Sequence, residues 1–441
     1  MGSFPRTPHD MAHNFWALPE EKTRRPKHIR RLVDRGEESH GIFDVRNYKH
    51  MDVVIGAGLG GGSLIYANVF MIPPDEIFDD RWPSSCKRAN LIPYYAIAKE
   101  VLGSRLIPVN NDPRRRIIRE QLFADVAKKN GRNSELVDIN VFFGNDFETP
   151  LPIGEQARNR YGALQTSCVY CAECDIGCNY HSKDTLDLNY LHAAEHRYQA
   201  VVATEHLVLK IVPTDQNGED DPHADGSTGY KVYYRDLLSR KPEVCSALAN
   251  RVVISAGSLG STELLLRCRE HFRTLPRISK KLGQCFSGNG DFLSILLGSN
   301  MPADPNYGPV ITQRTDYNLF RNFDPSRAFI LEDASYGSIL AWFVEGAKPG
   351  FLHLDAVRRL LRHLYTQLTT GKSPGSLGWA LGGCVLADDS SRGVTSADRK
   401  TFGEVFEYRN LYVANGAILP TAVGANPTGI TGVIPDAHLS D

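Results

Sequence analysis

The amino-acid sequence predicts a mixed α/β fold organised in two or three domains. The chain has 441 residues, 42% of them hydrophobic, which suffices for a large core. A short apolar run at 53–55 leads into a glycine-rich loop, and residues 200–256 contain several β-rich runs. Residues 258–267 then carry apolar side chains at helical spacing. Strands and helices are therefore both expected.

Periodicity and turn residues place the individual elements. Residues 1–50 are polar and basic with several prolines, which predicts an extended arm. Helices are expected at 112–129, 258–267 and 352–368, and strands at 200–203, 206–212, 230–234 and 251–255. The polar, glycine-rich residues 214–229 predict a long hairpin within a small antiparallel sheet.

Charge and hydropathy argue against several classes of partner. The formal net charge is −1 with acids and bases in balance, so nothing favours a nucleic-acid partner. No apolar run approaches the roughly 18–20 residues of a membrane span, which predicts no transmembrane segment. The first residues lack the apolar region of a signal peptide. For a chain that begins at Met1, a cytoplasmic location is expected.

A glycine loop follows the first predicted strand. Gly56, Gly58 and Gly61 satisfy the G-x-G-x-x-G pattern, in which a phosphate lies at a helix N-terminus. The crossover helix of that motif needs about a dozen residues, however, and Pro73 and Pro74 would end it early. The segment therefore predicts a loop whose backbone approaches a ligand, without the usual dinucleotide-binding helix.

Three further segments have a composition that favours ligand contact. An apolar strand at 251–255 runs into Ala256 and Gly257, and Ser258 or Ser261 can cap the helix that comes next. The other two are residues 286–292 (FSGNGDF) and residues 410–430, which are preceded by LGGC at 381–384. Taken one at a time, each glycine is more typical of a tight turn than of a binding site.

Together these segments resemble the glucose-methanol-choline (GMC) family of flavin oxidoreductases, most closely its cholesterol-oxidase-like branch. The four motifs keep the family's order, and the resemblance runs along the whole chain. It implies bound FAD and oxidation of the CH–OH group of an alcohol by hydride transfer to the flavin. The substrate implied is a small alcohol, sterol-like in class. The fold implied is a mostly parallel FAD-binding sheet joined to an antiparallel substrate-binding sheet.

The same resemblance implies where the domains and the cofactor contacts lie. It predicts an incomplete FAD-binding domain over 1–300, with segments inserted from the substrate side around 70–165, a substrate-binding domain over 301–378, and a return to the FAD-binding domain over 379–441. The implied cofactor-binding residues are Gly62, Tyr66, Ala67, Val69, Val208, Gly257, Gly416, Asn426 and Thr428. Tyr66 stands where many members have Asn, and Asn415 stands where they have Asp before Gly416.

Two departures from the family pattern bear on activity. Members begin with a strand, a G-x-G-x-x-G turn, a helix and a second strand, and residues 2–16 resemble the segment that comes after this unit. The parallel sheet is therefore expected to be N-terminally incomplete, and the chain truncated and weakly active or inactive. In addition, Trp379 occupies the position of the family's active-site His, so Trp379 and Asn426 are the candidate catalytic residues. An indole donates a hydrogen bond but cannot act as a base.

The nine cysteines include one dense run. Cys168, Cys171, Cys174 and Cys178 have the C-x2-C-x2-C-x3-C spacing of bacterial ferredoxins, although Asn179 replaces the usual Pro. In two-cluster ferredoxins the fourth Cys ligates the other cluster, and this chain has only one such run. The surrounding residues also resemble a structural segment of the GMC branch. We therefore expect no metal here, with an iron–sulfur cluster or zinc on these four residues as the alternative.

Three functions remain open on the sequence. The first is an FAD-dependent alcohol or sterol oxidoreductase, which the family resemblance favours. The second is a non-catalytic remnant without flavin. The third is an iron–sulfur electron carrier built on residues 168–178.

Overall fold

The computed structural model describes residues 4–7, 10, 14–17, 39–47, 52–108, 112–239, 243–291, 301–337 and 380–428. The chain forms two compact units. Unit 1 comprises Met1–Met71, Lys99–Val201 and Asp291–Leu377, and unit 2 comprises Ile72–Ala98, Val202–Gly290 and Gly378–Asp441. Among the described residues, none of the helices combines the length and apolar character needed to cross a bilayer. The helix expected at 352–368 lies outside these residues.

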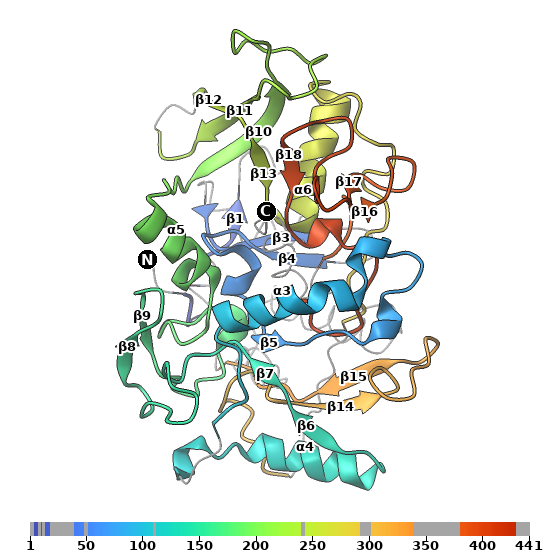
Figure 1. Cartoon of the computed structure of the whole chain (residues 1–441). Helices are drawn as coiled ribbons and strands as arrows, with labels where there is room; N and C mark the ends of the chain where they lie inside the picture. Colours follow the sequence, from blue (N-terminus) through green and yellow to red (C-terminus); the bar gives the residue numbers. More distant parts are fainter. Residues whose placement is uncertain are drawn as a thin grey trace, which may run out of the picture. The chain divides into compact units, whose positions relative to one another are not determined.

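Unit 1 is built from short antiparallel sheets (Figure 1). Its three-stranded sheet has the order β15 (Phe329–Glu332), β14 (Gln313–Tyr317), β6 (Ser134–Leu136). The two-stranded pairs are β1 (Trp16–Ala17) with β2 (Ser39–His40), β3 (Phe43–Asn47) with β4 (Asp52–Gly56), β5 (Val69–Phe70) with β7 (Asp138–Ile139), and β8 (Gln156–Arg158) with β9 (Leu164–Thr166). Two helices, α4 (Ile118–Lys129) and α5 (Tyr190–Tyr198), complete the unit, and α4 packs against β6 and β14.

The helix expected at 112–129 is present but begins later. A 3₁₀ turn, Pro113–Arg115, comes first, and the Asp112 carboxylate accepts the backbone N–H of Arg114 at its start. Arg116 and Ile117 are extended, so α4 begins only at Ile118. The short polar side chain of Asp112 satisfies one of the free amides at the start of the turn, which favours the 3₁₀ turn.

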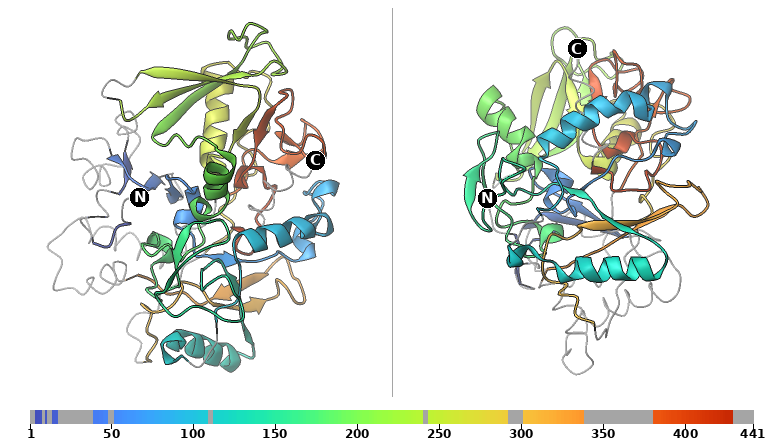
Figure 2. Two further views of the ribbon diagram at one scale, coloured as in Figure 1. Left: turned by 60° about the vertical axis from the view of Figure 1, so that its left-hand side comes forward. Right: turned by 60° about the horizontal axis from the view of Figure 1, so that its bottom comes forward.

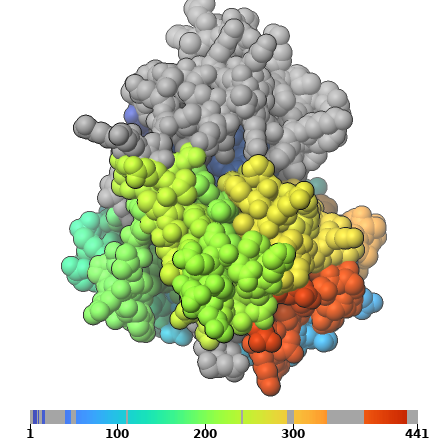
Figure 3. Space-filling view, turned by 90° about the horizontal axis from the view of Figure 1, so that it is seen from above, coloured from blue at the N-terminus to red at the C-terminus, as the bar shows by residue number. Residues whose placement is uncertain are grey.

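Unit 2 contains the antiparallel sheet expected within 200–256. Its order is β10 (His206–Pro213), β11 (Tyr230–Asp236), β12 (Val244–Ala249), and the polar residues 214–229 connect the first two strands as a hairpin. Helix α6 (Gly257–Leu266) lies against β10 (Figure 2). In the space-filling view, the green surface of the sheet adjoins the yellow surface of the residues that come after it in the chain (Figure 3). α3 (Arg88–Val101) also belongs mostly to this unit.

Parallel strand pairing is confined to two small pairs among the described residues. β13 (Val252–Ile254) pairs in parallel with β18 (Leu411–Val413), and β16 (Leu386–Ala387) with β17 (Thr395–Ser396). The mixed α/β class is therefore confirmed, together with its antiparallel sheets. The extensive parallel sheet implied by the family resemblance is present in the described part of the chain only as these pairs.

The strand expected at 200–203 is wrong. Helix α5 ends at Tyr198, and Gln199 adopts a left-handed conformation (φ 58°) that closes the helix. The next residues have no strand partner, and Val201 keeps 93% of its surface exposed. A β-branched residue stabilises a strand only where a neighbouring strand can pack against it.

The glycine loop has the form predicted for it. β4 pairs antiparallel with β3, and the loop then makes a four-residue 3₁₀ turn, Gly61–Leu64, with no crossover helix. Gly60 and Gly61 have positive φ values of 106° and 55°, which only glycine adopts without strain. The prediction that this segment is not a dinucleotide-binding βαβ motif is confirmed for the described residues.

Candidate functional site

In unit 2, each strand of the parallel pair β13–β18 is followed by a turn that contains a glycine. β13 is followed by residues 255–257 and β18 by residues 414–416, so Gly257 and Gly416 both lie at the carboxyl end of the pair. Ala414 donates its backbone N–H to the Ile254 carbonyl at 3.0 Å, which extends the pairing past the strands. In open α/β sheets, ligands bind at this edge, outside the carboxyl ends of parallel strands. This edge is the candidate cofactor site of unit 2.

Asn415 holds the two turns together. Its Oδ1 accepts the Ala417 backbone N–H at 2.8 Å, and its Nδ2 donates to Ser261 Oγ at 2.7 Å and to the Ile254 carbonyl at 3.2 Å. An ionised Asp, the residue usual in the family, could accept but could not make the two donor contacts. The substitution noted in the sequence therefore joins the end of β13 and helix α6 to the segment after β18.

Gly257 leaves open space at this edge. Its φ is +73°, and a Cβ built on it would meet no atom within 4 Å. The opposite holds for Gly382 and Gly383, where a Cβ would lie 2.1 Å from the Cys285 carbonyl oxygen and 2.2 Å from Thr262 Oγ1. Packing therefore explains the latter two glycines, whereas the space beside Gly257 can admit a ligand. This observation fits a nucleotide cofactor that approaches the backbone.

The C-terminal segment of unit 2 is anchored by the GNGD motif. Asn289, which is 6% exposed, donates from Nδ2 to the Ala425 carbonyl at 2.9 Å and accepts the Val423 N–H at 3.0 Å. This clamp fixes the residues immediately before Asn426, while Thr428 is buried. Asn426 and Thr428 are thus held on the same unit as Gly257 and Gly416. Trp379 lies outside the described residues.

Val208 lies within β10, where the strand is irregular. It pairs with Tyr234 on β11, and a bulge separates it from Lys210 in the register. A bulge leaves one residue's backbone groups out of the ladder. The sequence-based assignment of a backbone contact at Val208 stays a prediction.

The other predicted cofactor residues belong to the glycine loop of unit 1. Tyr66 is 5% exposed and donates its hydroxyl to the Asp184 carbonyl at 2.9 Å. Burial raises the Tyr66 pKa well above its usual value. The Lys183 ammonium lies 5.0 Å from the centre of the Tyr66 ring and donates to the carbonyls of Leu64 (2.9 Å) and Tyr66 (3.1 Å). The Tyr66 side chain therefore fixes the loop in the interior.

The loop also contains a buried side chain that sequence reasoning missed. Asn68 is 0% exposed and has a left-handed backbone (φ 59°). Neither its amide nitrogen nor its amide oxygen has a partner among the described residues. It separates Ala67 and Val69, both assigned to the cofactor. A buried amide costs free energy unless it is hydrogen-bonded, so this position requires a polar partner such as water or a ligand group. The one sequence signal was a small polar residue at the end of a glycine loop.

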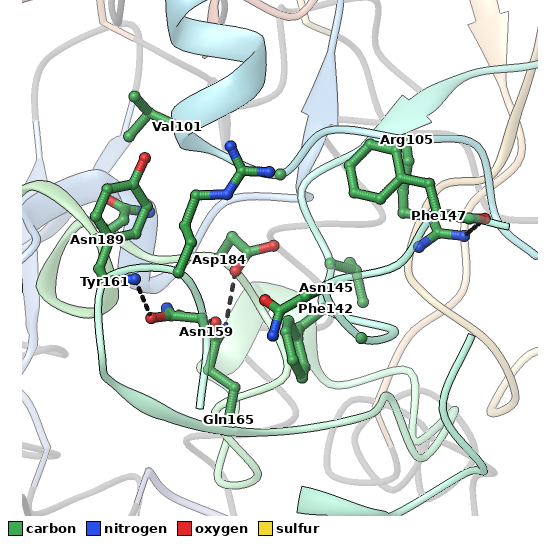
Figure 4. Close-up of a pocket in the computed structure, with 14 residues that line it drawn as sticks. Val101, Arg105, Phe142, Asn145, Phe147, Asn159, Tyr161, Gln165, Asp184 and Asn189 are labelled. Carbon is green, nitrogen blue, oxygen red and sulfur yellow. Dashed lines mark hydrogen bonds between the residues drawn. The ribbon is translucent and has the colours of Figure 1, made fainter. Parts of the chain in front are cut away.

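A pocket in unit 1 is lined by both apolar and polar side chains (Figure 4). Asp184, Gln165, Asn159 and Tyr161 line it, and Gln165 donates from Nε2 to Asp184 Oδ1 at 2.9 Å. Burial is the main cause that raises the pKa of the Asp184 carboxyl to about 7, while the Gln165 hydrogen bond opposes it. The pocket therefore contains a carboxyl group that titrates near neutral pH.

The four cysteines of the dense run line a second cavity of unit 1. Cys168, Cys171, Cys174 and Cys178 all face it, and all are free thiols. Burial raises the pKa of Cys171 and of Cys174 to about 12, so neither is a reactive thiolate at neutral pH. Among the described residues, no group of three or more His, Cys, Asp or Glu side chains is placed to hold a single metal ion.

Comparison with known proteins agrees with the family resemblance. No protein-family model matches the chain. The curated relatives that match include proteins named cholesterol oxidase. The one from Acinetobacter baumannii is 24% identical, over 95% of this chain and 85% of its own length. The one from Mycobacterium tuberculosis is 25% identical, over 88% and 78%. The resemblance to cholesterol-oxidase-like members of the GMC family is thereby confirmed.

Solved structures support the fold. Pyridoxine 4-oxidase from Mesorbium loti superposes with a TM-score of 0.50 at 12% identity, covering 97% of this chain and 92% of its own. A formate oxidase structure gives the same TM-score and identity, with coverage of 87% and 83%.

Proposed function

Starting from the confirmed resemblance to GMC, cholesterol-oxidase-like proteins, we propose that this chain is an FAD-dependent oxidoreductase that oxidises the CH–OH group of an alcohol. The carboxyl end of the β13–β18 pair carries the proposal, because Gly257 leaves open space there beside exposed backbone. The named cholesterol oxidases favour a sterol-like alcohol as the substrate class.

The family resemblance assigns cofactor contacts to residues in each unit, taken separately. In unit 2, Gly257, Gly416 and the backbone at Val208 would hold FAD, together with Asn426 and Thr428. In unit 1, the backbone of Gly62, Ala67 and Val69 would contact it, since the Tyr66 hydroxyl is already bonded to the Asp184 carbonyl. Bound FAD would accept the hydride from the alcohol carbon.

The residues assigned to the active site are better suited to position the alcohol than to accept its proton. An alcohol must lose its hydroxyl proton as the hydride leaves, and a positioned imidazole suits that task. The family's His is replaced here by Trp379, which cannot accept a proton. The Asn426 amide can orient the hydroxyl by hydrogen bonding. We therefore expect slow turnover in the chain as it stands.

The test is anaerobic mixing of the FAD-loaded chain with cholesterol and, separately, with short-chain alcohols. Bleaching of the flavin absorbance by an alcohol is the expected result. Trp379→His should accelerate it by about 10²-fold, the lower end of the usual gain from a general base. Asn426→Ala should slow it in both backgrounds. If the chain binds no FAD, or if bound FAD is never reduced by an alcohol, the non-catalytic interpretation replaces this proposal.

A further inference from the structure

Residues 287–290, which we call the GNG loop, have no assigned part in the proposed function. They belong to unit 2, as do the described residues 380–428. Ser287 forms an antiparallel bridge with Leu381, in which the Ser287 N–H donates to the Leu381 carbonyl at 2.9 Å and the Leu381 N–H donates back at 2.8 Å. Leu381 is buried and follows Trp379 by two positions. One end of the GNG loop is therefore fixed to the segment that follows a candidate catalytic residue in the chain.

Asn289 connects the GNG loop to the segment before the other candidate catalytic residue, Asn426. Its Nδ2 donates to the Ala425 carbonyl at 2.9 Å, and its Oδ1 accepts the Val423 N–H at 3.0 Å. All three residues are buried. Because buried backbone groups without partners are costly, an aliphatic side chain could not replace this amide. One side chain thus holds a three-residue stretch that ends immediately before Asn426.

The side chain of Asn289, and not its backbone, explains why an asparagine stands at this position. Asn289 has a left-handed backbone (φ 61°), which glycine adopts with less strain. Its N–H donates to Ser287 Oγ at 3.1 Å, a contact that a glycine could also make. The backbone alone would therefore favour glycine. The two hydrogen bonds of the amide to the segment before Asn426 are what glycine could not supply.

The segment bound by Ser287 is itself bonded to the turn after β18. Gly382 donates its N–H to the Gly416 carbonyl at 2.9 Å, and Cys384 donates its N–H to the Ala417 carbonyl at 2.9 Å. The GNG loop, residues 381–384 and the turn that contains Gly416 therefore form one hydrogen-bonded frame within unit 2. The contacts of Asn289 attach the segment before Asn426 to this frame.

An amide that orients a reacting hydroxyl must itself be held in place, because a misplacement of about 1 Å can cost about 10²-fold in rate. Asn426 has that task in the function proposed above, on which this inference rests. We propose that Asn289 is the positioning residue for Asn426. It acts through the backbone of residues 423–425, which it binds at both a donor and an acceptor, and not by contact with the alcohol.

The first test needs neither cofactor nor substrate. Asn289→Gly keeps the left-handed backbone and removes the amide, so amide hydrogen exchange in residues 419–428 should become about tenfold faster. Asn318→Gly is the matched control. Asn318 also has a left-handed backbone (φ 64°) and donates from Nδ2 to a carbonyl, that of Asn322, at 3.0 Å, but it belongs to unit 1. It should leave exchange in residues 419–428 unchanged. Unchanged exchange in Asn289→Gly would overturn the proposal.

The second test is a double-mutant cycle on the rate at which saturating alcohol reduces the FAD-loaded chain. Asn289→Gly alone should slow this rate by about 10²-fold. In the Asn426→Ala background the same substitution should slow it by less than about threefold, because a positioning residue acts only through the residue that it places. If the two effects multiplied in full, Asn289 would act through general stability and the positioning role would be wrong.

A second variant covers the case in which Asn289→Gly does not fold. Asn289→Asp keeps the acceptor for the Val423 N–H and loses the donor to the Ala425 carbonyl, so both readouts should change in the same direction by a smaller factor. The two tests also separate this proposal from the proposed function. If alcohol never reduces the flavin of the parent chain, the proposed function fails and hydrogen exchange alone decides whether Asn289 holds the segment. Normal reduction with unchanged exchange in the variants would overturn only the role of Asn289.

Discussion

Unit 1 encloses charged and titratable side chains, whereas unit 2 leaves backbone and open space at its candidate site. In unit 1, Lys183, Asp184 and the ion pair of Arg119 with Asp333 are all buried. In unit 2, the carboxyl ends of β13 and β18 present small residues and the space beside Gly257. The stability of unit 1 should therefore depend on charge, and ligand binding by unit 2 on the absence of side chains.

The largest effect is expected from the buried ion pair of unit 1. Arg119 Nε lies 2.8 Å from Asp333 Oδ2, with the side chains 7% and 1% exposed. The guanidinium also donates to the carbonyls of Tyr307 and Pro309. Arg119→Leu leaves a buried carboxylate without its cation, which should lower the free energy of unfolding by about 3–5 kcal/mol. Urea or thermal denaturation measures it.

An exposed ion pair of the same unit provides the matched control. Arg114 and Asp112 also form a 2.9 Å pair, but Arg114 is 65% exposed. Arg114→Leu should cost far less, because solvent already screens the pair. Equal losses from the two variants would contradict the view that burial makes the charge of unit 1 decisive.

The contrast also explains which features could be predicted from the sequence. The strands 206–212 and 230–234 and the helix at 258–267 depend on local periodicity, and all three are confirmed. Strand β12 was not expected, because its CSALA stretch lacks the β-branched residues that identify strands. It forms because β11 offers an edge to pair with.

The contacts of the candidate sites could not be predicted in the same way. Lys183 bonds to carbonyls of the glycine loop that lie more than a hundred residues earlier in the chain. The burial of Lys183 leaves no local pattern, and the only local sign of the orphaned Asn68 amide is its place at the end of a glycine loop. The glycines of unit 2 were found because a binding edge made of backbone needs small residues in fixed order. The family resemblance could supply that order, but not the roles of Asn415 and Asn289, which depend on tertiary contacts.

A pH-dependent effect is expected from Asp184 in unit 1. Its pKa is raised from 3.8 to about 7 in the folded chain, mainly by burial. Between about pH 4 and pH 7 the folded state holds a proton that the unfolded state has lost, so stability falls as pH rises through this window. Asp184→Asn keeps an oxygen for the Gln165 amide and should remove this fall, which amounts to at most about 4 kcal/mol.

Denaturation of both proteins at pH 5 and at pH 8 measures the Asp184 effect. The variant should gain more relative to the parent at pH 8 than at pH 5. The exposed Glu148→Gln is the control and should show no such difference. An equal change at both pH values would mean that the substitution acts by packing and not by charge.

The smallest effect is expected from replacing a glycine at the candidate cofactor site of unit 2. Gly257 and Gly131 both have positive φ (+73° and +68°), and a Cβ on either would meet no atom within 4 Å. Alanine at either position should therefore cost a similar amount of stability, about 1–2 kcal/mol for a left-handed residue. Only Gly257→Ala should also weaken FAD, by about tenfold or 1.4 kcal/mol, because its methyl group enters the space proposed for the cofactor. Titration of each variant with FAD, followed by flavin fluorescence, separates the two effects. If Gly131→Ala weakened FAD binding as much as Gly257→Ala, the loss would reflect general destabilisation. The carboxyl end of the β13–β18 pair would then no longer be supported as the cofactor site.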